Sequence, residues 1–394
     1  MIPPPVRKAS PLVGALQGAR GALLGMVLAA GLCPRACPAA DLLEEDVDGD
    51  GRPELILRNE YLRVVVDGGQ ARPGDGDRYG LRFPSGGWIR ELSWRPSHHE
   101  FFSLDYREGG QAPFTGLPEE FEQPVVLERG TGDAPRDLLL KVGIGTVRAE
   151  RVEDGNWRDF ELVEGARWTV QRIEREDGGR ALLFEQSFSA GEAAYVYRKR
   201  IVLDPGASSL RVERELRNTG SLPLHTTWYP HPCYAPGKGN EVGPAARAIV
   251  PLDVSERPGD VDTRPCPVLP PDPYLVWGGL PGRVPAEPWM AAGEAVGEHL
   301  LATSWGEASD WFRVWTTTHC FALEPFLVID LAPGAARPWT VRHQAVQGMD
   351  GLSAVRDGLL LKLEREADRL RLEVRPDRAR EDLRAQGYVR DPES

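Results

Sequence analysis

Apolar and polar residues alternate along most of residues 156–216. Turn sequences rich in Gly, Asp or Pro separate the alternating runs, which are residues 168–173, 181–188, 194–203 and 210–216. A period of two with short turns is typical of antiparallel β-sheet. No clear helix-period run precedes residue 350, so residues 41–348 are predicted to form one all-β unit in which residues 338–342 close the sheet.

The size of this unit narrows the choice among all-β folds. The chain has 394 residues, of which 41% are hydrophobic and 27% charged, and this composition is globular. The β unit is too long for a simple immunoglobulin-like sandwich, and it lacks the fixed-period repeat of a propeller. The pattern therefore predicts a large antiparallel sandwich of two sheets.

The last segment, residues 349–394, has a different pattern and is predicted to be an appendage without chemistry. Residues 359–364 and 370–374 can pair as a hairpin, and a helix over the first of these runs is the alternative. After Pro376 the chain is strongly charged, which indicates a short helix with a frayed end.

The first 40 residues have the pattern of a secretory signal peptide. A basic start is followed by the short apolar run 21–32 and by small residues up to Ala39 and Ala40, where cleavage is expected. This predicts a periplasmic or secreted protein. The apolar run is too short for a membrane span. A lipid anchor on Cys33 is the alternative, although Leu32 fits a lipobox poorly.

Composition excludes some partners and leaves others open. A formal net charge of −12 argues against nucleic acid and against an anionic membrane surface. The chain has 11 Trp, which either line a sugar site or fill the core. Three cysteines remain after cleavage, so at most one disulfide can form, and none of the spacings resembles a zinc site. They are Cys233, Cys266 and Cys320.

An acidic loop near the start of the β unit is a candidate metal site. Asp46, Asp48 and Asp50 alternate, and Glu54 follows at the ninth place. Oxygen ligands at this spacing wrap calcium in EF-hand loops, but the twelfth place is Leu57 and no helices flank the loop. The loop predicts a structural calcium ion, with a solvated acidic turn as the alternative.

Glu324 is the first candidate for acid–base chemistry. It lies in the apolar run 319–334, directly before Pro325. Burial in such surroundings raises the pKa of a carboxyl group toward the value that a general base needs near neutral pH. The alternative is a glutamate at a strand end that faces solvent.

His231 is the second candidate. It stands between Pro230 and Pro232 and among aromatic residues. Prolines fix the backbone and are disfavoured in a central strand, so the segment is predicted to be a rigid strand end. An imidazole held there is suited to proton transfer, and a packing histidine at a proline corner is the alternative.

The order of several short motifs resembles one known superfamily. Arg82 comes early, an Asn-Thr-Gly turn lies at 218–220, a His-Pro-aromatic segment lies at 231–234, and Leu-Glu-Pro lies at 323–325. The chain thus resembles the aldose 1-epimerase (galactose mutarotase) superfamily. Within that superfamily it more closely resembles secreted bacterial mutarotase-like proteins, and the resemblance spans about residues 55–345. The motifs shared with those proteins are 79–83, 139–145, 195–201 and 324–339.

The resemblance implies a galactose mutarotase-like β-supersandwich and an activity. The activity is the interconversion of the anomers of a free sugar, with Glu324 as general base and His231 as general acid. It requires no metal and no redox cofactor, and the expected partner is a monosaccharide or the end of a glycan.

The resemblance also implies residues that bind the substrate. Arg82 would hydrogen-bond the sugar oxygens, as would His98 or His99, and Trp88 would stack on the sugar face. The early histidine of the mutarotases has no clear match beyond His98 and His99. Their substrate-binding carboxylate has no single match, the candidates being Asp253, Asp260 and Asp262.

Two other functions fit the same sequence. One is a non-catalytic carbohydrate-binding β-sandwich, which export and the Trp content favour. The other is a related supersandwich that acts on polysaccharides.

Overall fold

A computed structural model describes most of the chain. The described residues are 38–68, 81–102, 116–131, 136–151, 157–235, 246–253, 261–262, 266–267, 277–278, 285, 287–294, 299–316, 320–349, 351–366 and 369–378. The expected all-β fold is confirmed, because every regular element in these residues is a β-strand and the sheets are antiparallel. Most of the predicted signal peptide and the tail after residue 378 lie outside the described residues.

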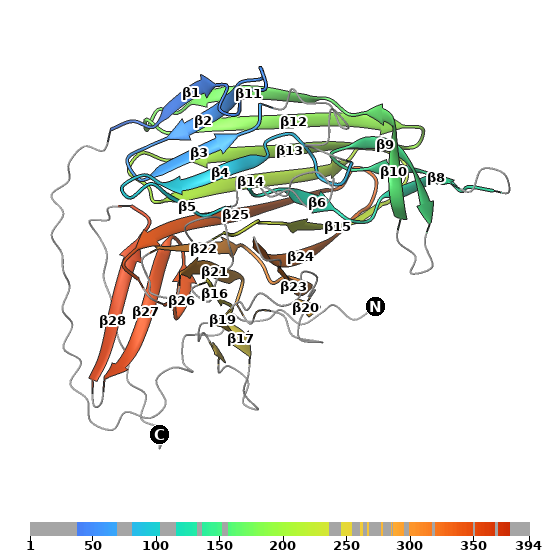
Figure 1. Cartoon of the computed structure of the whole chain (residues 1–394). Helices are drawn as coiled ribbons and strands as arrows, with labels where there is room; N and C mark the ends of the chain where they lie inside the picture. The colour runs from blue at the N-terminus through green and yellow to red at the C-terminus, as the bar shows by residue number, and fades with distance from the viewer. Residues whose placement is uncertain are drawn as a thin grey trace.

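The largest layer is a nine-stranded antiparallel sheet (Figure 1). Its strands are, in spatial order, β11 (Trp168–Glu174), β12 (Arg180–Ala190), β13 (Ala193–Leu203), β14 (Ser209–Asn218), β25 (Ala336–Gln347), β22 (His299–Trp305), β21 (Trp289–Glu294), β16 (Ala246–Ile249) and β19 (Cys266–Pro267). The first four are the alternating runs of the sequence, joined by short turns. The prediction that residues 338–342 close the sheet is wrong, because β25 lies in its middle, between β14 and β22.

The second layer consists of two five-stranded sheets. One contains β1 (Asp41–Glu45), β2 (Glu54–Arg58), β3 (Leu62–Val66), β4 (Ile89–Trp94) and β5 (His99–Glu100) in this order. The other has the order β20 (Trp277–Gly278), β23 (Trp311–Thr316), β24 (Phe321–Leu331), β15 (Leu224–Pro230) and β6 (Glu119–Phe121). Single bridges join the two sheets edge to edge, between Ile89 and Leu117 and between Phe102 and Tyr234.

The hydrophobic core lies between the two layers. One cluster of buried side chains draws on both, with Val64 of β3 and Leu327 of β24 on one side and Leu216 of β14 and Val341 of β25 on the other. Most tryptophans whose burial is described belong to the interior rather than to an exposed sugar platform. The buried ones are Trp88, Trp94, Trp228, Trp289, Trp305 and Trp339.

Three smaller sheets flank these layers. They are β10 (Trp157–Gly165), β9 (Gly145–Arg151), β8 (Arg136–Lys141) and β7 (Val125–Glu128); β17 (Leu252–Asp253) and β18 (Val261–Asp262); and β26 (Ala354–Arg356), β27 (Leu359–Glu366) and β28 (Arg369–Pro376). Of the two alternatives for residues 359–374, the structure has the hairpin, formed by β27 and β28.

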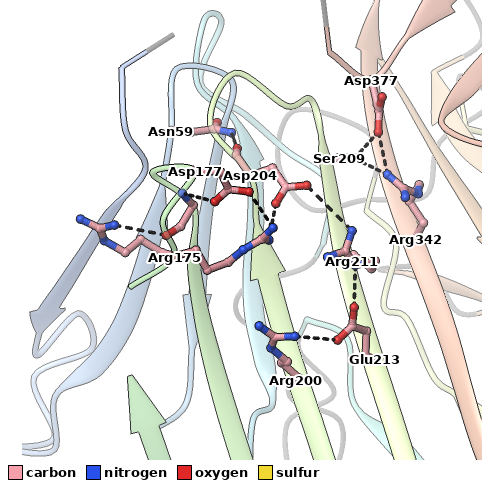
Figure 2. Close-up of polar contacts among 12 residues, drawn as sticks. Asn59, Arg175, Asp177, Arg200, Asp204, Ser209, Arg211, Glu213, Arg342 and Asp377 are labelled. Carbon is pink, nitrogen blue, oxygen red and sulfur yellow. Dashed lines mark hydrogen bonds and ion pairs between the residues drawn. The ribbon is translucent and has the colours of Figure 1, made fainter. Parts of the chain in front are cut away.

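Asp377 fastens this last sheet to the nine-stranded one. Its buried carboxylate accepts hydrogen bonds from Arg342 of β25 at 2.6 Å and from Ser209 of β14 at 3.0 Å (Figure 2). Nearby in the same view, Asp204 accepts a hydrogen bond from Arg175 at 2.5 Å and forms an ion pair with Arg211 at 3.9 Å. Charged pairs thus lie across the end of the large sheet, and the pair between Arg342 and Asp377 attaches the C-terminal hairpin to it.

A disulfide joins Cys233 and Cys320, which the sequence left unassigned among three cysteines. Cys233 lies just past the end of β15, and Cys320 directly precedes β24. The bond therefore fixes the ends of two neighbouring strands. No membrane-spanning helix occurs in the part of the chain that the structure describes.

Candidate functional site

Alternation along β24 and β15 brings the two acid–base candidates to one face of their sheet. On β24, Leu323 and Leu327 belong to the hydrophobic core, so Glu324 points to the opposite, outer face. On β15, Trp228 belongs to the core, and Tyr229 points outward with Glu324. His231 follows Tyr229 by two residues in extended chain and continues on the outer face.

Glu324 and His231 meet as a buried pair. Nε2 of His231 lies 3.4 Å from Oε1 of Glu324, and each side chain is only 3% exposed. The main-chain amide of His231 donates a hydrogen bond to the carbonyl of Pro118 at 2.8 Å, and the ring of Phe83 packs edge-on against the imidazole at 5.5 Å. The pair is therefore held in place by backbone and packing contacts.

Burial sets the charge state of this pair. It raises the pKa of Glu324 to about 8, although Arg313 and Arg82 act in the opposite direction. It also lowers the pKa of His231 to about 3, and Arg82 lowers it further. Near neutral pH the pair therefore holds one proton, which resides on the Glu324 carboxyl group, and the imidazole is uncharged.

Arg82 stands beside the pair within a network of charged hydrogen bonds. Its Nε donates to Oε2 of Glu120 at 2.7 Å, and its Nη2 donates to the hydroxyl of Tyr229 at 2.9 Å. Lys141 donates to the other oxygen of Glu120 at 2.8 Å, and the Tyr229 hydroxyl also donates to Glu120. The Arg82 side chain is 44% exposed, so the network anchors a guanidinium group that reaches solvent.

Glu120 is the fixed anion of this network. Burial opposes its ionisation, but the charges of Lys141 and Arg82 outweigh that effect and hold the pKa of the carboxyl group well below its usual range. A permanent carboxylate and an anchored guanidinium next to a protonated carboxyl group make a strongly polar, preorganised surface.

Aromatic rings form the rim of the site. Trp311 stacks on Phe326 with ring centroids 3.4 Å apart, and Phe326 stacks on Tyr229 at 4.3 Å. The guanidinium of Arg313 lies over Trp311 and Phe326 at 5.0 and 5.1 Å from their centroids. Trp311 and Arg313 are partly exposed, whereas Phe326 is buried, so the site grades from an accessible rim to a buried acid–base pair.

The remaining residues expected to bind the substrate lie elsewhere or are covered. Trp88 is 3% exposed and packs edge-on against Phe83 at 5.9 Å, so it forms part of the wall behind that ring. His98 is exposed on a turn with a φ of 55°. His99 stacks on His299 of the nine-stranded sheet. The structure brings Arg82 to the Glu324–His231 pair and places His98 and His99 in a different part of the second layer.

The acidic loop gathers only part of its expected calcium ligands. Carboxylate oxygens of Asp46, Asp48 and Asp50 lie within 4.8 Å of one another on the surface. Glu54 instead accepts hydrogen bonds from the amide of Val47 and from Arg90, each at 2.8 Å. The three aspartates thus lie close together, Arg90 pairs with both Asp48 and Glu54, and bound calcium stays a prediction.

Sequence reasoning missed several residues of the site. Tyr229 carried a signal, because it stands two residues before His231 in an extended run and therefore shares its face. Glu120 and Arg313 carried none, since their approach depends on how β6 and β23 pair with β15 and β24.

Solved structures that are similar to this chain include three bacterial proteins. A galactose mutarotase-like protein from Clostridium acetobutylicum is 9% identical over 78% of this chain and 99% of that one, with a TM-score of 0.49. A putative aldose 1-epimerase from Escherichia coli K12 is 16% identical over 78% and 100%, with a TM-score of 0.43. A galactose mutarotase-like protein from Lactobacillus casei is 13% identical over 74% and 100%, with a TM-score of 0.42.

No family model and no curated protein matches the sequence. The three structures are of the kind that the sequence motifs resemble. Identities of 9–16% and TM-scores below 0.5 assign no activity and no residue role to this chain.

Proposed function

We propose that this chain is an exported, aldose 1-epimerase-like protein that interconverts the anomers of a free sugar at Glu324 and His231. The observation that carries the proposal is the buried contact of 3.4 Å between Nε2 of His231 and Oε1 of Glu324, next to the Arg82 network. Ring opening of a sugar requires one group that gives a proton and one that takes a proton close to the same C–O bond.

The resting charge state suggests how the two residues share this work. The Glu324 carboxyl group gives its proton to the ring oxygen as the bond between that oxygen and the anomeric carbon breaks. His231 takes the proton of the anomeric hydroxyl, whose O–H electrons become the second bond of the carbonyl. Rotation about the adjacent C–C bond and ring closure return both protons and yield the other anomer.

In this order of proton transfers, the two residues have the opposite roles in ring opening from those that the family resemblance implies. Glu324 acts as acid and His231 as base when the ring opens, and the roles reverse when it closes. Each residue therefore serves in both roles within one turnover. The ion pair that forms between the two steps lies beside fixed charges from Arg82 and Glu120.

The surrounding groups are suited to holding a sugar. Arg82, 44% exposed and held in place by the buried Glu120, offers a fixed donor for hydroxyl groups. Trp311, stacked on Phe326, offers an aromatic face for the C–H face of the ring. None of the proposed steps requires a metal or a redox cofactor.

The test is an anomerisation assay by NMR or polarimetry across common hexoses. The wild-type chain should equilibrate at least one sugar faster than the blank, and Glu324→Gln should reduce the rate of that step by about 10²–10⁴-fold. Asp330→Asn is the matched control, because Asp330 lies on the same strand face and pairs with the exposed His225. If every sugar equilibrates at the blank rate and Glu324→Gln changes nothing, the enzyme proposal fails.

A non-catalytic carbohydrate-binding protein is the second candidate. The observation in its favour is the network of Arg82, Glu120 and Tyr229 with the Trp311 rim, which can bind a sugar without any proton transfer. This candidate requires saturable glycan binding that survives Glu324→Gln and His231→Ala and is weakened by Trp311→Ala. Loss of binding in Glu324→Gln would speak against it.

Export is part of the proposal. It is supported by the signal-peptide pattern of residues 1–40 and by the Cys233–Cys320 disulfide, since stable disulfides are typical of oxidising compartments. N-terminal sequencing of the protein from its natural host should find a mature chain that starts near Asp41. An intact Met1 in a cytoplasmic fraction would contradict export.

A further inference from the structure

A second cluster of functional groups lies where the two layers meet. His99 comes from β5 of the first five-stranded sheet, and Glu294 and His299 come from the neighbouring ends of β21 and β22 in the nine-stranded sheet. Figure 1 shows the ends of β5, β21 and β22 in one region of the molecule. The cluster therefore brings together side chains from two different sheets.

The three side chains lie close together, with the two imidazole rings stacked. The imidazole rings of His99 and His299 are parallel within 5° and 4.0 Å apart. Nδ1 of His99 lies 3.9 Å from Oε1 of Glu294, and Nδ1 of His299 lies 4.0 Å from Oε2 of the same carboxylate. One ligand atom from each residue lies within 4.8 Å of the other two.

Direct hydrogen bonds do not account for this arrangement. Distances of 3.9 and 4.0 Å are too long for a hydrogen bond between these groups. In addition, Nε2 of His99 is buried without a hydrogen-bond partner among the described residues. The carboxylate and the two imidazoles thus lie close together at distances longer than hydrogen bonds to one another, and Nε2 of His99 is a buried polar atom of the kind that normally finds a partner.

The spacing suits a metal ion between the groups. Bonds of about 2.0–2.2 Å from zinc to nitrogen and oxygen separate neighbouring tetrahedral ligands by about 3.3–3.5 Å. Rotation of one imidazole out of the stack, together with contraction of the present spacing by about half an ångström, would complete such a set. The side chains are 12%, 20% and 7% exposed for His99, Glu294 and His299, so water can reach the remaining coordination positions.

A supporting contact orients one of the two rings. Nε2 of His299 lies 2.6 Å from Oγ of Ser97, which leaves Nδ1 on the side of Glu294. Hydrogen bonds of this kind to the second ring nitrogen are the usual support of a metal-binding histidine.

We propose that His99, Glu294 and His299 form a site for one divalent transition-metal ion of the zinc class, which ties β5 to the β21–β22 hairpin. Two imidazoles and one carboxylate favour such an ion over calcium or magnesium, which prefer oxygen ligands. The site is independent of the sugar chemistry at Glu324 and does not rest on it.

The test is metal binding by the full chain after removal of metals with a chelator. Calorimetric titration with ZnCl₂ should find one ion per chain, and Zn²⁺ should raise the Tm. His299→Gln and Glu294→Gln should each weaken binding by about 100-fold or more, because each removes a ligand. Ser97→Ala should weaken it by about 10-fold, as expected for a group that only orients a ligand.

Matched controls separate this site from ordinary surface binding. His98→Gln removes the exposed neighbouring histidine, and Asp48→Asn weakens the acidic loop; both variants should bind Zn²⁺ as the wild type does. Circular dichroism confirms that each variant is folded. The proposal is overturned if the wild type binds no Zn²⁺ at micromolar concentration, if folded His299→Gln binds it equally well, or if Asp48→Asn abolishes binding.

Discussion

Two adjacent glutamates of β6 have different roles, one in the stability of the interior and one in the candidate site. Glu119 points into the core side, where Lys199 and Arg214 each lie 2.7 Å from its carboxylate. Glu120 points to the outer face and carries the network of Arg82 and Lys141. Because successive side chains of β6 point to opposite faces of the sheet, one glutamate lies in the interior and the other lies in the candidate site.

Replacing Glu119 should test the interior half of this arrangement. Glu119→Gln leaves two buried cations without their counter-charge, and the expected loss is about 3–5 kcal/mol in the free energy of unfolding at pH 7, measured with urea. Glu213→Gln is the control, since its pair with Arg200 is half-exposed and should change stability by less than about 1 kcal/mol. Equal stability of the two variants would contradict the role of Glu119.

The same residue predicts a pH dependence of stability. Burial opposes the ionisation of Glu119, but Lys199 and Arg214 prevail and lower its pKa to about 2. A lowered native pKa contributes stability above the unfolded value of about 4.3, and this contribution is lost as the pH falls from there toward 2. The stability difference between wild type and Glu119→Gln should therefore shrink over this interval, as followed by urea unfolding at several pH values.

Replacing Tyr229 should test the network around Glu120 on the outer face. Tyr229→Phe removes the hydroxyl that accepts from Arg82 and donates to Glu120, and kcat/KM for anomerisation should fall by about 5–30-fold, equivalent to about 1–2 kcal/mol. Tyr195→Phe is the control, because the buried Tyr195 hydroxyl bonds Gln186 at 2.6 Å within the core. It should lower stability and leave kcat/KM unchanged. Equal kinetic losses in both variants would remove Tyr229 from the site.

At the scale of elements, the sequence predicted which segments form strands better than it predicted which strands pair with one another. The alternating runs that became β11–β14 were visible because adjacent hairpin strands bury one face each. The central place of β25 was not visible, since it pairs with β14 and β22 across long stretches of chain. Local patterns report burial of a face, whereas strand order depends on packing between distant segments.

The same distinction explains the candidate sites. Glu324 and His231 were found because each disturbs its own surroundings, as a carboxylate in an apolar run and as a histidine between prolines. The cluster of His99, Glu294 and His299 was not found, because His99 lies about 200 residues before the other two in sequence and only the packing of β5 on β22 brings them together.

The disulfide predicts an element-scale effect. Cys233 and Cys320, 87 residues apart, tie the end of β15 to the start of β24. The double variant Cys233→Ala/Cys320→Ala should lose about 2–4 kcal/mol in the free energy of unfolding. Thiol titration of unfolded, unreduced wild-type protein should find two thiols fewer than after reduction. Equal thiol counts before and after reduction would contradict the pairing.

At the scale of the whole molecule, the nine-stranded sheet supports a site that lies on the far side of the core. The inner faces of β15 and β24 pack in the interior, and their outer faces carry Glu324 and Tyr229, with the rim residue Trp311 on the neighbouring β23. The C-terminal sheet is attached separately, through Asp377 (Figure 2). Stability and proposed chemistry are thus placed on opposite faces of the same strands.

The central claim is that Glu324 and His231 share one proton and pass it through the sugar. The most direct test is the pH dependence of kcat/KM for anomerisation, corrected for the blank. Because the pair loses its proton as the pH rises through the pKa of Glu324, at about 8, and gains a second one near pH 3, where His231 titrates, kcat/KM should be level between about pH 4 and 7 and fall above 8. A kcat/KM that rises through pH 8 to a plateau would show that ionised Glu324 is the active form, and would contradict the shared-proton account.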